Sequence, residues 1–283
     1  MKKDRSKLNP SPGNPPRVIS VTSGKGGVGK TNIVGNLAIA LSRIGKKVLV
    51  LDADLGLANI DIIFGIHPEY NIGHVISGEK TLSEIIVKGP ENIRIIPAGS
   101  GFVNLTHLTD GQKLALMSEF EALEDLLDIM LIDTSAGISR NVIYFNLAAD
   151  DCIIVATSEP ASLTDAYAMM KVMATQHGAK YFKLLVNMVC DEAEAKSVYL
   201  NLGQAIERFL KDVVIEYISY IPMDEFMKKA VKNRKAVIEL YPDSASSRMI
   251  RKTAEQILGW PRRVDSEGNI KFFLKRYMDY RAG

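Results

Sequence analysis

The strongest chemical signal in the sequence is the glycine-rich string GKGGVGKT at residues 24–31. It has the form G-x-x-x-x-G-K-T and stands between an apolar, β-branched run and a stretch with helical spacing. Glycines let the backbone turn tightly, so that successive N–H groups and the start of the helix point at phosphate oxygens. Lys30 would reach the β- and γ-phosphates, and the Thr31 hydroxyl would bind Mg²⁺. The string therefore predicts a nucleoside triphosphate site, because a ligand-free glycine turn would not require this context on both sides.

Three aspartates stand at the ends of two predicted strands. Asp52 ends the run KVLVLD and Asp54 comes two residues later, while Asp133 ends the run IMLID. A ligand of an open parallel sheet binds beyond the carboxyl ends of the strands, so we expect the three side chains to converge near the phosphate loop. A single acid after a strand is usually a helix cap or a turn residue, but three beside a phosphate loop favour a site. Asp133 fits the acid that holds a water of the Mg²⁺ shell.

The elements that must position these residues alternate between β-branched apolar runs and segments of helical period. The predicted strands cover residues 17–23, 47–52, 93–98, 129–133, 152–157, 182–189 and 215–221. The predicted helices cover residues 30–44, 112–127, 161–177, 192–211 and 245–258. Most runs lack polar alternation, which is typical of strands covered by helices on both faces. We predict an α/β fold, a doubly wound and mostly parallel sheet over residues 17–261, after a short flexible tail at 1–16.

The composition excludes several classes of protein. The 283 residues include 35 Lys and Arg against 33 Asp and Glu, a formal net charge of +2, which does not indicate a polyanion-binding protein. No apolar run approaches the roughly 18 to 20 residues that span a bilayer, and the charged N-terminus lacks the apolar core of a secretory signal. Cys152 and Cys190 lie in apolar runs that we predict to be buried strands, without CxxC spacing. A disulfide framework, a zinc site and an iron–sulfur cluster are therefore not expected, and a reducing cytoplasm fits.

The near-neutral total hides an uneven distribution of charge. Residues 1–17 hold five basic residues and one acid, and residues 262–283 hold six basic residues and three acids. The remaining residues, 18–261, therefore hold 24 basic and 29 acidic residues, a net charge of −5. An acidic body disfavours nonspecific DNA binding, whereas basic ends favour an anionic membrane surface.

The C-terminal segment 262–283 has the pattern of an amphipathic helix. An apolar face recurs at helical spacing and is flanked by cations: Ile270, Phe273, Leu274, Tyr277 and Met278, with Lys271, Lys275 and Arg276 beside them. Such a stripe can lie in the interface of an anionic membrane. It can equally pack against the protein's own surface, and the period does not distinguish the two.

The string GKGGVGKT resembles the deviant Walker A motif of the MinD/ParA ATPases, and the resemblance extends from about residue 18 to the C-terminus. Within that family the chain looks most like the FlhG (FleN) flagellar number regulators. The stretches that carry this likeness are VGKTNIVGNLA (28–38), LDADLGLANIDIIFGI (51–66), DTSAGIS (133–139), EPASLTDAYAMMKV (159–172) and GNIKFF (268–273). The resemblance implies an ATPase that forms an ATP-dependent sandwich dimer, in which Lys25, the signature lysine, reaches the partner's nucleotide.

The resemblance also implies which residues hold the nucleotide, with ATP and Mg²⁺ as the cofactors. The phosphate end would be bound by the loop and the residue that follows it: Gly24, Lys25, Gly26, Gly27, Val28, Gly29, Lys30, Thr31 and Asn32. Gly137 would present its N–H group to the γ-phosphate. The adenine end would be recognised by three residues near the ends of later strands, Asn187, Pro222 and Asp224.

For hydrolysis, the resemblance implies that each of the three aspartates has a separate role. Asp54 would orient the attacking water. Asp52 would support the outer shell of a metal held by Thr31 and Asp133, with the carboxylates acting through water. The catalytic set implied in this way is Lys25, Lys30, Asp54 and Asp133.

FlhG-type proteins are cytoplasmic ATPases that bind the inner face of the membrane, in some cases at the cell pole, and set the number and position of flagella. The implied partners are a second copy in the ATP state, with a monomer otherwise, the GTPase FlhF, switch-ring proteins and a flagellar transcription activator. A MinD-type regulator of the division site and a ParA-like DNA partition ATPase are the alternatives, and the acidic body argues against direct DNA binding.

The sequence departs from the family pattern in two places. The N-terminal tail shows no DQAxxLR-like segment, which in some relatives stimulates FlhF. Ser135 stands where small residues are common, with no expected effect on the chemistry.

Overall fold

The computed structural model describes residues 15–54, 60–97, 99, 109–124 and 126–261. Residues 1–14 and the tail 262–283, which holds the predicted amphipathic helix, lie outside the described residues. Among the helices that are described, none combines the length and the apolar character that crossing a bilayer requires.

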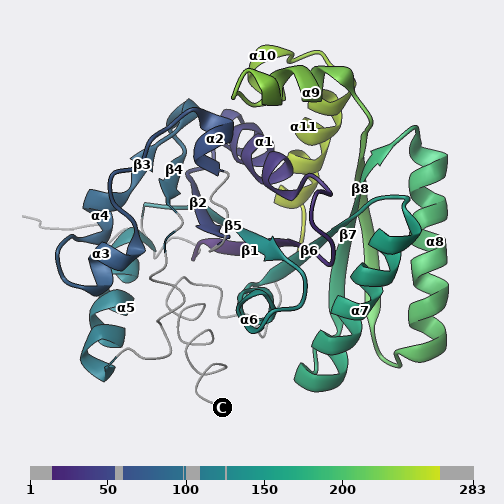
Figure 1. Cartoon of the computed structure of the whole chain (residues 1–283), viewed down its shortest axis with the longest axis horizontal. Helices are drawn as coiled ribbons and strands as arrows, with labels where there is room; N and C mark the ends of the chain where they lie inside the picture. Colours follow the sequence, from purple (N-terminus) through teal and green to yellow (C-terminus); the bar gives the residue numbers. More distant parts are fainter. Residues whose placement is uncertain (1–14, 55–59, 98, 100–108, 125, 262–283) are drawn as a thin grey trace, which may run out of the picture.

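An eight-stranded sheet runs through the middle of the molecule in the order β3-β4-β2-β5-β1-β6-β7-β8 (Figure 1). The strands are β1 (Arg17–Ser23), β2 (Val48–Ala53), β3 (Val87–Lys88), β4 (Arg94–Ile96), β5 (Ile129–Ala136), β6 (Asp151–Ala156), β7 (Tyr181–Val189) and β8 (Val214–Pro222). Every neighbouring pair is parallel except β3 with β4. The chain places β5 between β1 and β2 and then continues with β6 on the other side of β1. The predicted doubly wound sheet is therefore confirmed, and the strand order reverses beside β1, where ligands of such sheets bind.

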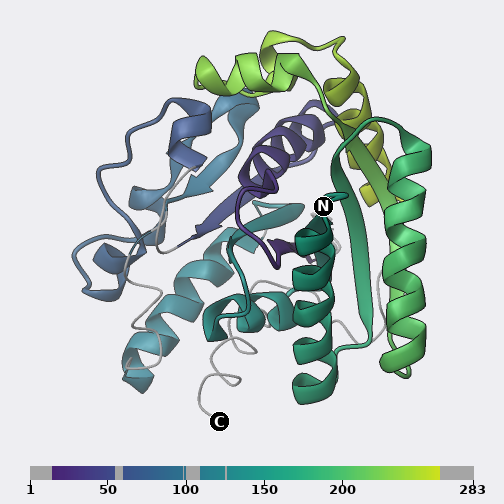
Figure 2. The same ribbon diagram turned by 45° about the vertical axis from the view of Figure 1, so that its right-hand side comes forward.

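Helices cover both faces of this sheet (Figures 1 and 2). One face carries α1 (Lys30–Arg43), α2 (Ile60–Phe64), α9 (Glu225–Lys232), α10 (Val237–Leu240) and α11 (Ala245–Leu258). The other carries α3 (Ile72–Ile76), α4 (Leu82–Ile85), α5 (Asp110–Glu124), α6 (Arg140–Ala148), α7 (Pro160–His177) and α8 (Glu192–Phe209). Each face has its own apolar core, one including Ile33 and Leu37 of α1 and the other including Phe120 of α5 and Phe145 of α6.

The two covered faces explain why the strands read as unbroken apolar runs. Strands β1, β2 and β6 are buried at every position, because side chains on both sides of the pleat meet a helix layer. Several helices open at a polar cap. Asp191 accepts the backbone N–H of Glu194 at the start of α8, and Ser244 accepts that of Ser247 at the start of α11.

Several short elements were not predicted, and one cysteine was placed wrongly. Helices α2, α3, α4, α6, α9 and α10 each have nine residues or fewer, and β3 has two, so none gives a long periodic signal. Cys152 is buried in β6, as expected. Cys190 is exposed instead of lying in a buried strand, because β7 ends at Val189 and the backbone N–H of Cys190 donates to Glu194 Oε2 at 2.7 Å.

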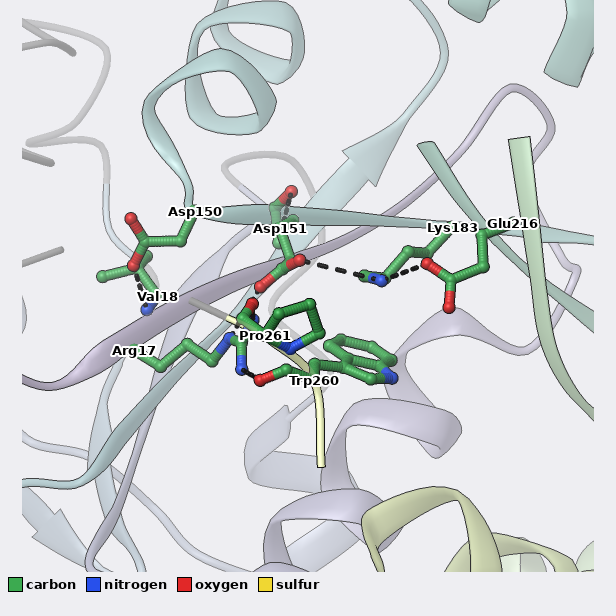
Figure 3. Close-up of polar contacts among 9 residues, drawn as sticks. Arg17, Val18, Asp150, Asp151, Lys183, Glu216, Trp260 and Pro261 are labelled. Atoms are coloured by element: carbon green, nitrogen blue, oxygen red, sulfur yellow. Dashed lines mark hydrogen bonds and ion pairs between the residues drawn. The ribbon is translucent and has the colours of Figure 1, made fainter. Parts of the chain in front are cut away.

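A buried polar network lies at the start of β1, whereas the phosphate loop follows its end (Figure 3). Arg17 donates from Nε to Asp151 Oδ2 at 2.7 Å and from its terminal nitrogens to the carbonyls of Trp260 and Pro261 at 2.9 and 2.8 Å. Lys183 Nζ lies 4.1 Å from the centre of the Trp260 ring. Asp151 is almost fully buried, and its loss would leave the buried Arg17 guanidinium without a carboxylate partner, at a cost of about 3–5 kcal/mol. The network therefore fixes the point at which the chain leaves α11.

Candidate functional site

The phosphate loop joins the end of β1 to the start of α1. Gly27 and Gly29 have φ of 80° and 86°, the left-handed region that residues with a Cβ seldom adopt. Gly29 is the N-cap of α1, and the first turn of this helix has neither a side-chain cap nor an acidic residue. The positive end of the helix dipole and its first N–H groups are therefore not neutralised by the helix's own cap or first turn, which suits an anion.

Neighbouring elements hold the loop in this shape. A Cβ on Gly24 would lie 2.2 Å from the backbone carbon of Asp165, so α7 packs against the loop too closely for any other residue. Asn187 at the end of β7 donates from Nδ2 to the carbonyl of Val28 at 2.7 Å. A Cβ on Gly29 would meet that same Nδ2 at 2.5 Å. Asn187, predicted to recognise adenine, thus braces the phosphate loop in this structure.

Asp52 and Asp133 lie opposite each other on the neighbouring strands β2 and β5, and both are almost completely buried. Burial, followed by the charge of Asp133, raises the pKa of Asp52 to about 8. Burial also raises the pKa of Asp133 to about 6, opposed by the charge of Lys30 and a hydrogen bond from Thr31. The strand register therefore brings together the acids and the loop residues that the sequence predicts to converge.

The donor set fits Mg²⁺ bound with a nucleotide. Asp133 Oδ1 is buried and has no hydrogen-bond partner among the described residues, although a buried acceptor left unpaired is costly. A water of a magnesium shell would donate to it. No group of three His, Cys, Asp or Glu in the described part of the chain could hold a metal ion. Mg²⁺ keeps several waters and is bound by few protein ligands together with phosphates.

We expect Mg²⁺–ADP to stabilise the protein more at pH 8 than at pH 6. The folded-state pKa values of Asp52 and Asp133 lie above the ordinary value of 3.8, so their contribution to stability is lost as the pH rises from about 4 to about 8. The metal needs ionised carboxylates and must displace protons at the lower pH, which weakens binding by about tenfold per displaced proton for each unit below the pKa. The measurement is the shift in melting temperature at saturating Mg²⁺–ADP, with Asp52→Asn as the control that flattens the pH dependence. An equal shift at both pH values would contradict the assignment.

Asp54 follows β2 directly and faces the end of β5. Its backbone N–H donates to Asp52 Oδ1 at 3.1 Å, and its Oδ1 accepts the hydroxyl of Ser135 at 2.8 Å. Gly137, two residues beyond Ser135, has φ of 92° and donates its N–H to the carbonyl of Ser23 at 2.9 Å. The amide predicted to meet a γ-phosphate is thus bonded to β1 here, and contact with a phosphate would require that bond to open.

Lys25 is held at the mouth of the loop by a residue that the sequence did not single out. Its Nζ lies 2.5 Å from Glu159 Oε2, just before α7. The lysine side chain is 38% exposed and the glutamate 65%, so the pair is worth only about 0–1 kcal/mol. Lys25 can therefore leave Glu159 at little cost.

Comparisons with known proteins agree with this geometry. The family described as AAA domain matches residues 16–184, and that described as NUBPL iron-transfer P-loop NTPase matches residues 112–258. Antiactivator FleN of Pseudomonas aeruginosa is 40% identical over 95% of this chain and 96% of its own. Flagellum site-determining protein YlxH of Helicobacter pylori is 34% identical over 93% of this chain and 90% of its own. This chain belongs to the MinD/ParA family of P-loop ATPases.

Solved structures that resemble this chain have the same fold, that of a MinD/ParA-type ATPase. A chain of the MinC:MinD cell division protein complex of Aquifex aeolicus matches with a TM-score of 0.70 and 26% identity, covering 88% of this chain and 98% of that one.

The adenine end of the ATPase site is less well defined than the phosphate end. Asp224 is the N-cap of α9, and its two carboxylate oxygens accept the backbone N–H groups of Phe226 at 2.9 Å and Ser246 at 3.0 Å. Partial burial acts to raise the pKa of Asp224, but these hydrogen bonds outweigh it and lower the pKa. The carbonyl of Pro222 accepts the Ser246 hydroxyl at 3.4 Å. Both residues thus shape the turn after β8, and their contact with adenine stays a prediction.

Proposed function

We propose that this ATPase is a nucleotide-controlled switch that dimerises with ATP, binds the cytoplasmic face of the membrane reversibly and limits the number and placement of bacterial flagella. The flagellar assignment is supported by the flagellum site-determining protein YlxH, and by the resemblance to the FlhG (FleN) regulators that the antiactivator FleN match bears out. The similarity to both relatives covers nearly the whole chain. Its partners would be flagellar assembly proteins such as FlhF, switch-ring proteins or a flagellar transcription activator.

The observation that carries the switch is the position of Lys25. In one chain it is exposed, beside the phosphate loop, and paired weakly with Glu159. In a sandwich of two copies, Lys25 would exchange this carboxylate for the triphosphate of the partner, whose charge is larger and less exposed to water. ATP then contributes to the dimer interface itself, and loss of the γ-phosphate weakens it.

Hydrolysis would be carried out by residues that bind and orient, since phosphoryl transfer to water needs little covalent participation by the protein. Lys30 and the loop amides would hold the phosphates, and Thr31 with Asp133 would hold Mg²⁺. The bound metal would neutralise part of the negative charge on the phosphates. Asp54 would orient the attacking water.

Membrane binding would depend on the segment 262–283, whose aromatic and apolar stripe edged by cations suits an anionic surface. One short amphipathic helix binds weakly. A dimer would carry two on one body, so that the second binds at a high effective concentration and membrane avidity rises without a new contact per helix.

We expect ATP to increase membrane binding only when the tail is present. The full chain and a version ending at Pro261, which keeps the network around Arg17, are sedimented with anionic liposomes in ATP and in ADP. The full chain should pellet at least about tenfold more in ATP, as two anchors replace one. In a strain lacking the gene, the full chain should restore the number of flagella per cell, and the truncated version should not. Equal pelleting of both versions would refute the membrane role.

A cell-division regulator is the second candidate, since MinD proteins are also similar to this chain, at 31% identity over 86% of it in Helicobacter pylori. Overproduction of the full chain in the same strains distinguishes the flagellar role from the cell-division role. Filamentous cells with a normal number of flagella would favour the cell-division role. A ParA-like role in DNA partition is disfavoured by the net charge of −5 over residues 18–261.

A further inference from the structure

Met188, near the carboxyl end of β7, has a backbone conformation that residues with a side chain seldom adopt. Its φ is 59°, in the left-handed region that a Cβ disfavours. The pairing of β7 with β8 shifts at this point, because Asn187 lies opposite Ile221 and Val189 lies opposite the next residue, Pro222. Met188 is therefore an extra residue in β7, a bulge. Bulges and left-handed residues are frequent at functional sites, where they re-aim a side chain.

The bulge brings the Met188 side chain out of the core beside the phosphate loop. Its neighbours Asn187 and Val189 are 7% and 0% exposed, whereas Met188 is 40% exposed. Its terminal methyl carbon lies 3.4 Å from the place that a Cβ on Gly29 would take. The Asn187 amide is directed at the loop and bonded to the carbonyl of Val28. Met188, which the sequence did not single out, is thus the exposed side chain at this edge of the loop.

The three acids of the site indicate on which side of the loop the rest of a nucleotide lies. Asp52 and Asp133 come from β2 and β5, and Asp54 follows β2, so the metal and the terminal phosphate belong on that side of β1. Strands β6, β7 and β8 lie on the other side of β1. A nucleotide bound along the loop would therefore extend its base toward the ends of β7 and β8. Two exposed apolar side chains lie there, Met188 and the 61% exposed Met223, whose N–H donates to the carbonyl of Val189 at 2.8 Å.

We propose that Met188 contacts the base of the bound nucleotide and packs its thioether against the face of the adenine ring. The inference deepens the ATP switch proposed above and rests on it, because it requires a nucleotide in this site. Thioether sulfur packs favourably on aromatic rings, and a flexible, unbranched side chain adapts to a flat surface. The contact buries apolar surface and reads no hydrogen-bonding group, so it raises the affinity for a nucleotide without selecting one purine over another.

The test compares Mg²⁺–ADP with Mg²⁺–pyrophosphate, which lacks the adenosine, in calorimetric titrations of the full chain. Neither ligand has a γ-phosphate, so the ATP-dependent dimer does not contribute to the measured affinity. Met188→Ala should weaken ADP binding about fivefold, the effect of one thioether–ring contact, and should leave pyrophosphate binding unchanged. Met188→Leu keeps the apolar volume and should retain the affinity for ADP within about twofold.

Two further variants separate a contact with the base from a structural role. Met188→Gly removes the side chain together with the strain of the left-handed backbone. It should therefore weaken ADP binding as much as Met188→Ala does, while the urea midpoint of unfolding does not fall. Leu200→Ala is the matched control, because it removes an apolar side chain that is 58% exposed on α8. It should bind both ligands as the wild type does.

An unchanged affinity of Met188→Ala for ADP would overturn the base contact. If the same variant also lost the ATP-dependent dimer, Met188 would belong to the contact between two copies instead. Equal weakening of ADP and pyrophosphate binding would overturn the proposal as well, because the side chain would then act through the phosphate loop. The proposed switch fails on a different result, a wild-type chain that binds ATP and stays a monomer, and that result leaves the base contact standing.

Discussion

Replacement of Lys30 by alanine should weaken ATP binding by at least about 100-fold, which corresponds to about 3 kcal/mol. Lys30 is the buried cation of the phosphate loop, only 7% exposed, and its charge opposes the rise in the pKa of Asp133. Its removal takes away a charge-assisted contact to the phosphates in a site where water screens little. It also raises the pKa of Asp133 further, so the carboxylate that would hold the Mg²⁺ shell is protonated over a wider pH range. The measurement is equilibrium titration with a fluorescent ATP analogue.

Lys25→Ala is the matched control for this loss, since it removes the exposed lysine of the same loop. It should leave the affinity of one chain for ATP within about threefold, because its charge is paired at the surface, while it impairs the ATP-dependent dimer. Circular dichroism spectra of the Lys30→Ala and Lys25→Ala variants should match that of the wild type, which checks that both variants fold. An affinity of Lys30→Ala within tenfold of the wild type would show that this lysine is not the main phosphate contact.

Replacement of Asp54 by alanine should remove hydrolysis and keep the protein in its ATP state. Loss of a group that orients or activates the nucleophile typically costs about 10²–10⁴-fold in rate. The variant keeps the loop, Lys30 and Asp133, so ATP affinity should change little. Size-exclusion chromatography should then show a dimer with ATP that persists for hours, and a monomer with ADP.

Glu207→Ala controls for the loss of a carboxylate as such, because this glutamate is exposed on α8. It should hydrolyse ATP at the wild-type rate and return to the monomer. Hydrolysis at an undiminished rate by Asp54→Ala would reject the orienting role. A monomer in ATP would instead reject the ATP-dependent dimer while leaving the hydrolytic assignment standing.

The structure brings together the residues that the sequence predicts for the phosphate end, whereas the contacts predicted for the adenine end stay a prediction. Residues 24–31 are contiguous, and the loop depends on glycines whose positive φ is a property of the residue type. Asp52 and Asp133 were predicted to converge because both end apolar strands, and parallel strands carry their ends to one edge. Asn187 ends such a strand as well, yet its amide nitrogen is bonded to Val28 in the loop. The partner of a polar group at the end of a strand depends on which strand lies beside it. The hydrophobic periodicity of the sequence predicts the strands but not their order in the sheet.

The sequence by itself determined the fold class, the loop and the long buried elements, because apolar period and glycine content act over a few residues. It also determined the charge separation between an acidic body and basic ends. Only the tertiary structure decided that Ser135 holds Asp54, that Glu159 holds Lys25 and that α7 excludes a side chain at Gly24. The two hydrogen bonds join residues 81 and 134 positions apart in the chain. Their formation requires β5 to lie between β1 and β2 and β6 to lie beyond β1, and this arrangement is set by how the helices pack on the two faces of the sheet.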